Sequence, residues 1–214
     1  MSPSFLIAMF PLQLVIFPGE VLPLHIFEPR YKELIGECES DGITFVIPTF
    51  VNQSVSQFGT EVSLVKVMRR YDDGELDILV RGERVVKLLE VVERYGEKLY
   101  SGVRCEAAPY YADAEEEVEN ALRVKVLELA QLLERTSPLT ELTQDSFAFA
   151  LAPFLNLNLS QKLTLLAMHS ERDRQEFLTR HVDELIKEVK KRVTTQNTMM
   201  VRNGRSNGVS KPRG

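Results

Sequence analysis

Cysteine and histidine are scarce in this sequence, and their spacing excludes the common metal sites. The 214 residues include two cysteines and three histidines. Cys38 and Cys105 are far apart and form no CxxC motif, so neither a zinc knuckle nor a redox pair is indicated. His25, His169 and His181 form no HExxH motif and no i, i+4 pair. We predict two buried free thiols, no metal site and no cofactor.

Long apolar runs are also missing. No stretch approaches the roughly 18 to 20 apolar residues that a membrane-spanning helix needs. The apolar N-terminus contains no lysine or arginine before Arg30, and Pro11 and Pro18 interrupt it, so it lacks the pattern of a signal peptide. We therefore expect a cytoplasmic protein with no membrane partner.

Positive charge is not in excess. The formal net charge is -5 and the isoelectric point is about 5.4, which argues against a basic surface over the whole protein of the kind that nucleic acids attract. No window interleaves lysine or arginine with aromatic residues for stacking on RNA bases. Nucleic acid is therefore an unexpected partner, although an RNA-binding function stays open as an alternative.

The motifs of common enzymes are absent as well. The sequence has no GxSxG elbow, no GxGxxG loop and no GxxxxGK[ST] phosphate loop. The acidic run at residues 115–119 is better explained as the exposed first turn of a helix, where negative charge is favourable, than as acid–base chemistry. We expect no enzymatic activity and propose no catalytic residue.

The sequence constrains the backbone conformation most strongly at residues 10–31, which contain four prolines. Each proline fixes its own φ, removes a backbone donor and pushes the preceding residue toward extended geometry. The segment is therefore predicted to be extended strand interrupted by turns. Its prolines are Pro11, Pro18, Pro23 and Pro29.

The remainder of the first half has mostly the period of β-strands. Residues 43–47 form a short apolar run closed by Pro48, and alternation over 61–69 resumes at 76–80 after an Asp-Asp-Gly turn, which predicts a hairpin. Further strands are expected at 85–92 and 99–105. Residues 31–39 are predicted to be helical, with one apolar face formed by Tyr31, Leu34, Ile35 and Cys38.

The second half has a helical period. Asp113 is predicted to cap a helix ending before Pro138, a short apolar helix follows at 147–155, and Ser160 and Ser170 are expected to cap two more helices. Polar residues dominate from residue 194. We divide the chain into a β-rich subdomain at 1–106, a helical subdomain at 107–193 and a disordered tail at 194–214.

The opening also resembles the start of the N-terminal, substrate-binding domain of Lon protease. In that family FPL, FPG and PLxIFExRY elements recur in this order, and glycine elements follow around a central hairpin. Here the matching segments are residues 10–12, 17–19, 23–31, 59–62, 73–74 and 82–85. Residues 159–166 resemble a later helix of the family, but Lys162 is followed by Leu163 where Lon domains often carry a Lys-Gln pair. The resemblance covers approximately residues 5–190.

The resemblance implies an α+β fold, with a mainly antiparallel, six-stranded, PUA-like β pseudo-barrel followed by an α-helical bundle. It also implies non-catalytic recognition of proteins or peptides. The expected partners are unfolded or client polypeptides and, for an adaptor in protein quality control, an ATP-dependent protease or chaperone. Because no ATPase or peptidase motif is present, we expect a stand-alone domain. A homodimeric assembly protein is a further alternative.

Candidate peptide-binding residues lie in the opening segment, where prolines limit how fully the chain can join a sheet. Such a surface would combine apolar groups with charge, and an extended client could meet it through side chains or backbone. A packing role is the competing interpretation for each residue. Four neighbours are expected in the core, namely Leu12, Leu24, Ile26 and Phe27. The candidates are Phe17, Pro18, Pro23, Arg30 and Tyr31.

Overall fold

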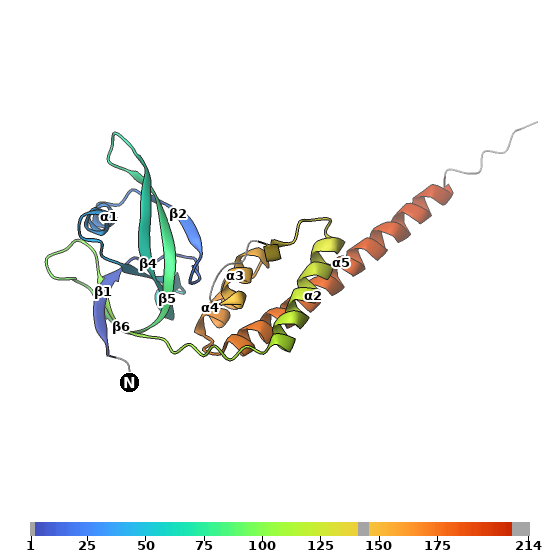
Figure 1. Ribbon diagram of the computed structural model, residues 1–214. Helices are drawn as coiled ribbons and strands as arrows, with labels where there is room; N and C mark the ends of the chain where they lie inside the picture. The colour runs from blue at the N-terminus through green and yellow to red at the C-terminus, as the bar shows by residue number, and fades with distance from the viewer. Residues whose placement is uncertain (1–2, 141–145, 207–214) are drawn as a thin grey trace, which may run out of the picture.

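The computed structural model describes residues 3–140 and 146–206 as a β-barrel followed by a group of helices (Figure 1). One six-stranded sheet forms the barrel. Its strands are β1 (Phe5–Met9), β2 (Val21–Ile26), β3 (Phe45–Val51), β4 (Ser54–Arg70), β5 (Leu76–Val92) and β6 (Gly102–Ala107).

The barrel closes because β5 is long enough to serve two neighbours along one edge. The strand order is β2-β5-β4-β3-β1-β6, and a further pairing joins β5 to β6. β5 pairs with β4 along one edge, while its other edge pairs first with β2 and then with β6. Only the β1–β3 pairing among those described is parallel. The predicted mainly antiparallel, PUA-like barrel is confirmed.

The predicted hairpin is confirmed, but its strands are longer than expected. The separate strand predicted at 85–92 is wrong, because β5 continues through Gly82 with a register shift against β4 in place of a turn. Likewise β3 does not stop at Pro48, since the irregularity between Pro48 and Phe50 absorbs the missing donor. Bulges therefore let single strands bend where the sequence suggested breaks.

Helix α1 (Pro29–Asp41) packs on the barrel with the predicted face inward. Its buried residues are Tyr31, Leu34, Ile35 and Cys38. The helix begins at Pro29, whose missing N–H costs nothing at the first position, and ends at Gly42 in left-handed conformation with φ of 66°. Both cysteines are buried and free, as predicted.

The second half is helical, as expected. It contains α2 (Glu116–Leu132), the 3-10 turn Pro138–Thr140, α3 (Phe147–Leu151) with its 3-10 extension Ala152–Phe154, α4 (Leu159–Ala167) and α5 (Glu171–Ser206). In Figure 1, α2 lies along the first part of α5, and α5 projects beyond the other helices. No helix in the described ranges is long and apolar enough to cross a membrane.

Two of the predicted helix caps are wrong. Glu115, not Asp113, occupies the N-cap of α2, because the Asp113 carboxylate instead accepts hydrogen bonds from the Ser170 hydroxyl and the Arg172 N–H. Asn158, not Ser160, caps α4 in a full capping box with Gln161. The cap predicted at Ser170 is confirmed by the bond from the Asp173 N–H to its Oγ, 3.0 Å long.

Helix α5 is longer than predicted. The sequence analysis ended it near residue 193, and the structure continues it to Ser206. The disordered tail at 194–214 stays a prediction. No proline interrupts the chain between Glu171 and Pro212, and the helical hydrogen-bond ladder can propagate until one does. Residues 207–214 of the predicted tail lie outside the described part.

Candidate functional site

The segment that leads into the Phe17-Pro18-Gly19 turn joins the barrel to the helices. The Thr60 and Thr49 hydroxyls donate to the carbonyls of Ile16 and Leu14, at 2.6 and 2.7 Å. Beyond these anchors, Phe17 enters the core of the helical bundle and stacks on Phe149, with ring centroids 5.4 Å apart. The turn is therefore fixed from both sides.

Gly82 of β5 lies directly under this turn. Its N–H donates to the Glu20 carbonyl at 2.9 Å, and its own carbonyl accepts from Gly19 at 2.7 Å. A Cβ at Gly82 would lie 2.2 Å from the Phe17 carbonyl oxygen, closer than any real contact. Only glycine allows this approach, so the FPG element and the later glycine element are one structural unit.

A carboxylate holds the other side of the same turn. Glu20 accepts a hydrogen bond from the Phe17 N–H at 2.9 Å. Burial raises the pKa of the Glu20 carboxyl, and the Phe17 N–H and the charge of Lys162 oppose that shift. The turn is thus rigid, and Pro18 is held facing the helices.

A cavity of about 400 Å³ lies between this turn, β5 and the helices. Its volume is in the range of pockets that bind ligands. Apolar groups from both halves of the chain line it together with arginine, histidine and backbone. The lining consists of Pro18, Gly19, Arg81–Val85, Ala107–Tyr110, Ser146, Phe149, Leu166, Met168, His169 and Arg174.

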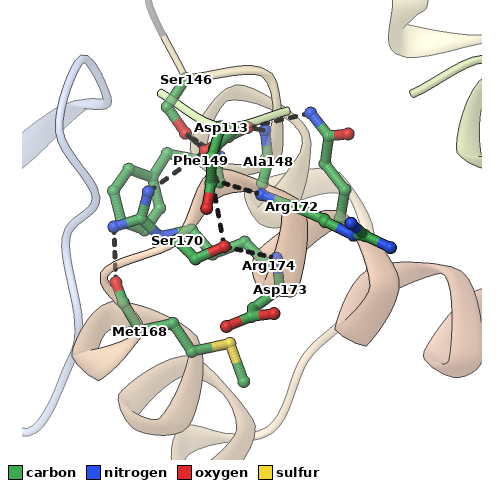
Figure 2. Close-up of polar contacts among 11 residues, drawn as sticks. Asp113, Ser146, Ala148, Phe149, Met168, Ser170, Arg172, Asp173 and Arg174 are labelled. Atoms are coloured by element: carbon green, nitrogen blue, oxygen red, sulfur yellow. Dashed lines mark hydrogen bonds and ion pairs between the residues drawn. The ribbon is translucent and has the colours of Figure 1, made fainter. Parts of the chain in front are cut away.

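The floor of the cavity contains a buried ion pair at the start of α5 (Figure 2). Arg174, which is 1% exposed, donates to Glu171 at 3.2 Å and to the Met168 carbonyl at 2.6 Å. Its guanidinium lies 4.0 Å from the Phe149 ring centroid and 5.1 Å from that of Tyr110. This arrangement holds a cation between two aromatic rings.

The Glu171 carboxylate connects the residues of that cluster through hydrogen bonds. Its carboxylate accepts from the Ser146 hydroxyl at 2.6 Å and from the Ala148 N–H at 2.8 Å. Burial lowers the pKa of Arg174, and the hydrogen bond to Glu171 opposes the shift. Because arginine keeps its proton in proteins, Arg174 remains a cation. Arg174 Nε and Gln175 Oε1 have no hydrogen-bond partner within the described residues.

The predicted candidates do not gather at one surface. Pro18 lines the cavity. Pro23 is exposed on β2, and Arg30 is exposed in the first turn of α1, where it pairs with Glu28 at 2.7 Å. Phe17 and Tyr31 are 1% and 5% exposed, so the accessible apolar surface expected of them is absent. Phe17 packs on Phe149, and Tyr31 stacks on Phe10 with ring centroids 3.8 Å apart.

Of the four residues of the opening that were expected in the core, three pack there and Phe27 does not. Leu12 and Leu24 are partly buried against the barrel core. Ile26 is 1% exposed, as expected, but Phe27 is 58% exposed. Most residues of the cavity were not predicted as a site, because the lining comes from five separate segments that only the tertiary fold brings together. The signal that existed was the paired glycine elements, which mark a close backbone approach.

Comparisons with known proteins agree with this architecture. A crystal structure of a Lon N-terminal domain protein from Xanthomonas campestris is 24% identical, with a TM-score of 0.63, over 81% of this chain and 96% of that chain. The N-terminal domain of a Mycobacterium avium complex Lon protease is 18% identical, with a TM-score of 0.66, over 84% and 98%. These likenesses show the fold.

Among curated proteins, none is significantly similar to the chain. The sequence model of the ATP-dependent protease La (LON) substrate-binding domain, however, matches residues 7–184. That range includes the barrel, the cavity and most of the helical bundle. The chain therefore belongs to the family of Lon substrate-binding domains.

Proposed function

We propose that this protein is a non-catalytic recognition module that binds unfolded or client polypeptides in the cavity between the barrel and the helices. Membership of the substrate-binding family supports the class of function. The single observation that supports the location is the cavity lining, which combines apolar side chains from both halves of the chain with exposed polar residues of β5. Extended chains offer matching groups, namely apolar side chains and unpaired amides.

The proposed role in the cell is that of an adaptor. A bound client would be presented to an ATP-dependent protease or chaperone, which would supply the energy for unfolding. The sequence contains no phosphate-binding-loop motif, which supports the proposal that a partner would hydrolyse the ATP. Of the residues predicted from sequence, Pro18 is the one that we retain in the proposed site.

The proposal is tested with a permanently unfolded protein. Fluorescein-labelled, reduced and carboxymethylated α-lactalbumin is titrated with the protein, and binding is followed by fluorescence anisotropy, with native α-lactalbumin as the comparison. We expect saturable binding of the unfolded form only. Failure of the unfolded form to bind would overturn the proposed function.

Two matched variants locate the binding surface. Pro109→Glu introduces a charge at the exposed rim of the cavity, and Pro23→Glu introduces the same charge on the exposed strand β2. We expect Pro109→Glu to weaken binding of the unfolded protein about tenfold, because it places a charge beside the apolar lining, and Pro23→Glu to leave it unchanged. The reverse ranking would favour the surface predicted from sequence. Circular dichroism verifies that both variants are folded.

A further inference from the structure

The outer edge of β5 is incompletely covered at the cavity. β2 pairs with β5 as far as Arg81, and β6 pairs with it from Val86 onward. Between them, loop residues bond to Gly82 and to the Val85 carbonyl. Glu83 is opposite no residue in the registers of β2, β4 or β6, as expected for the extra residue of a bulge. The edge of β5 between the ends of β2 and β6 is therefore covered by loop residues and not by a neighbouring strand.

The cations at this edge differ in how fully they are paired. Arg84 bonds to Glu61 at 2.6 Å, and Arg174 is paired with Glu171. Arg81 is exposed, lines the cavity and has no ion pair or side-chain hydrogen bond within the described residues.

The one acidic residue of the described lining is already engaged. The Glu83 carboxylate accepts a hydrogen bond from the Ser63 hydroxyl at 2.5 Å on the neighbouring strand. It therefore has a partner on β4, whereas Arg81 has none. Among the charged side chains of the described lining, Arg81 is therefore the one without a side-chain partner, while Glu83 is held by the neutral hydroxyl of Ser63, the residue opposite Arg81 on β4.

Apolar side chains form the inner wall next to this cation. Phe149 and Leu166 are buried members of the bundle core, and Met168 packs against that core. An apolar side chain entering the cavity would contact these groups, while a neighbouring residue of the same ligand would lie at the rim.

We propose that the cavity selects extended polypeptide segments in which an acidic side chain follows an apolar one. The apolar side chain packs against Phe149, Leu166 and Met168, and the carboxylate bonds to Arg81. A guanidinium can bind a carboxylate through two parallel hydrogen bonds. This inference rests on the proposed function and specifies its substrate class.

The test uses two fluorescein-labelled ten-residue peptides. Both have a Gly/Ser/Thr background, and their central residues are Val-Leu-Asp in one and Val-Leu-Asn in the other. Anisotropy titrations compare wild type with Arg81→Gln. Arg94→Gln is the matched control, since Arg94 is also exposed and without a side-chain partner in the described chain but does not line the cavity.

For wild type and Arg94→Gln we expect the aspartate peptide to bind about fivefold more tightly than the asparagine peptide at low salt, as for a charge pair at a rim. For Arg81→Gln the two affinities should be equal. Raising the salt concentration should reduce the wild-type preference. Equal binding of both peptides to wild type, or a preference that persists in Arg81→Gln, would overturn the inference.

The unfolded α-lactalbumin titration separates the two proposals. If that protein binds in a manner sensitive to Pro109→Glu while the peptides show no preference for aspartate, the acidic selectivity is wrong and the proposed function stands. If unfolded α-lactalbumin does not bind, the proposed function is wrong and the inference that rests on it is wrong too.

Discussion

The close approach of two backbones at Gly82 is the tightest constraint in the barrel. Gly82→Ala would place a methyl group 2.2 Å from the Phe17 carbonyl oxygen, and backbone cannot rotate away as a side chain can. We expect a loss of about 2 to 3 kcal/mol in the free energy of unfolding, within the range for overpacking. Urea denaturation followed by circular dichroism measures it.

Gly36 in α1 is the matched control for that substitution. A Cβ there would have no neighbour within 4 Å, and alanine favours helix over glycine by about 0.5 to 1 kcal/mol. Gly36→Ala is therefore expected to stabilise the protein. If both substitutions had the same sign, the close approach at Gly82 would not be the cause.

The buried pair of Glu171 and Arg174 is a second residue-scale constraint. Glu171→Gln keeps the size of the side chain but leaves the guanidinium buried without a charged partner, which costs about 3 to 5 kcal/mol. Glu188 pairs with Arg192 at 3.8 Å, and both side chains are largely exposed. Glu188→Gln should therefore change stability by less than about 0.5 kcal/mol. Comparable losses in urea denaturation would argue against the buried network.

Among single residues, His25 is expected to make the stability of the fold depend on pH. Its Nδ1 lies 2.8 Å from Asp77 and its Nε2 lies 2.9 Å from Glu75. The hydrogen bond to Asp77 is the main cause of a raised His25 pKa, and Glu75 adds to it. A raised folded pKa gives stability that is complete below the unfolded pKa of about 6.5 and is lost as pH rises through the folded value.

NMR titration of the imidazole protons tests this assignment. We expect the His25 pKa above about 6.5 in the wild type and a lower value in Asp77→Asn, which removes one carboxylate. A His25 pKa that is unchanged in the variant would contradict the role of Asp77.

At the scale of elements, local sequence patterns predicted a helix or strand correctly where one of its faces is buried against the barrel core. The four residues on the predicted face of α1 are the four that the structure buries, because a helical stripe reports burial directly. The hairpin was equally local. By contrast, the Asp113 carboxylate accepts hydrogen bonds from Ser170 and Arg172, which are more than fifty residues away in the sequence. No pattern near Asp113 could reveal that partner.

The candidate site was less predictable than the fold. Pro18 was identified from its motif, but Arg174 and Phe149 belong to helices whose packing against the turn depends on the whole tertiary structure. The same limit explains why Phe17 was predicted to be accessible. It follows a loop in the sequence, but helices from the other half of the chain cover it. Burial between distant segments has no local period.

Helix α4 offers a direct test of the corrected cap. Asn158 accepts from the Gln161 N–H at 2.9 Å, and Gln161 Oε1 accepts from the Asn158 N–H at 2.9 Å. Asn158→Ala removes one of these bonds and should cost about 1 kcal/mol. Ser160→Ala, at the cap expected from sequence, should cost less than about 0.5 kcal/mol. Thermal denaturation ranks the two, and the opposite order would restore the serine as the cap.

For the whole molecule, the decisive question is whether barrel and helices unfold together. We propose to keep the subdomains at 1–106 and 107–193 as descriptive units, but Val15 and Phe17 of the first belong to the core of the second. Phe58 and Val85 pack against that same core. Contacts of this kind couple the two halves, so neither retains its full core alone.

We therefore expect a single cooperative transition in the wild type. Helix content at 222 nm and tyrosine signals in the near ultraviolet should follow the same urea curve. Phe17→Ala removes the ring that stacks on Phe149, should cost about 3 to 5 kcal/mol, and should separate the two curves. Phe27→Ala, which truncates a side chain that is 58% exposed, should leave them coincident. Curves that already differ in the wild type would mean that the Phe17 contact does not couple barrel and bundle.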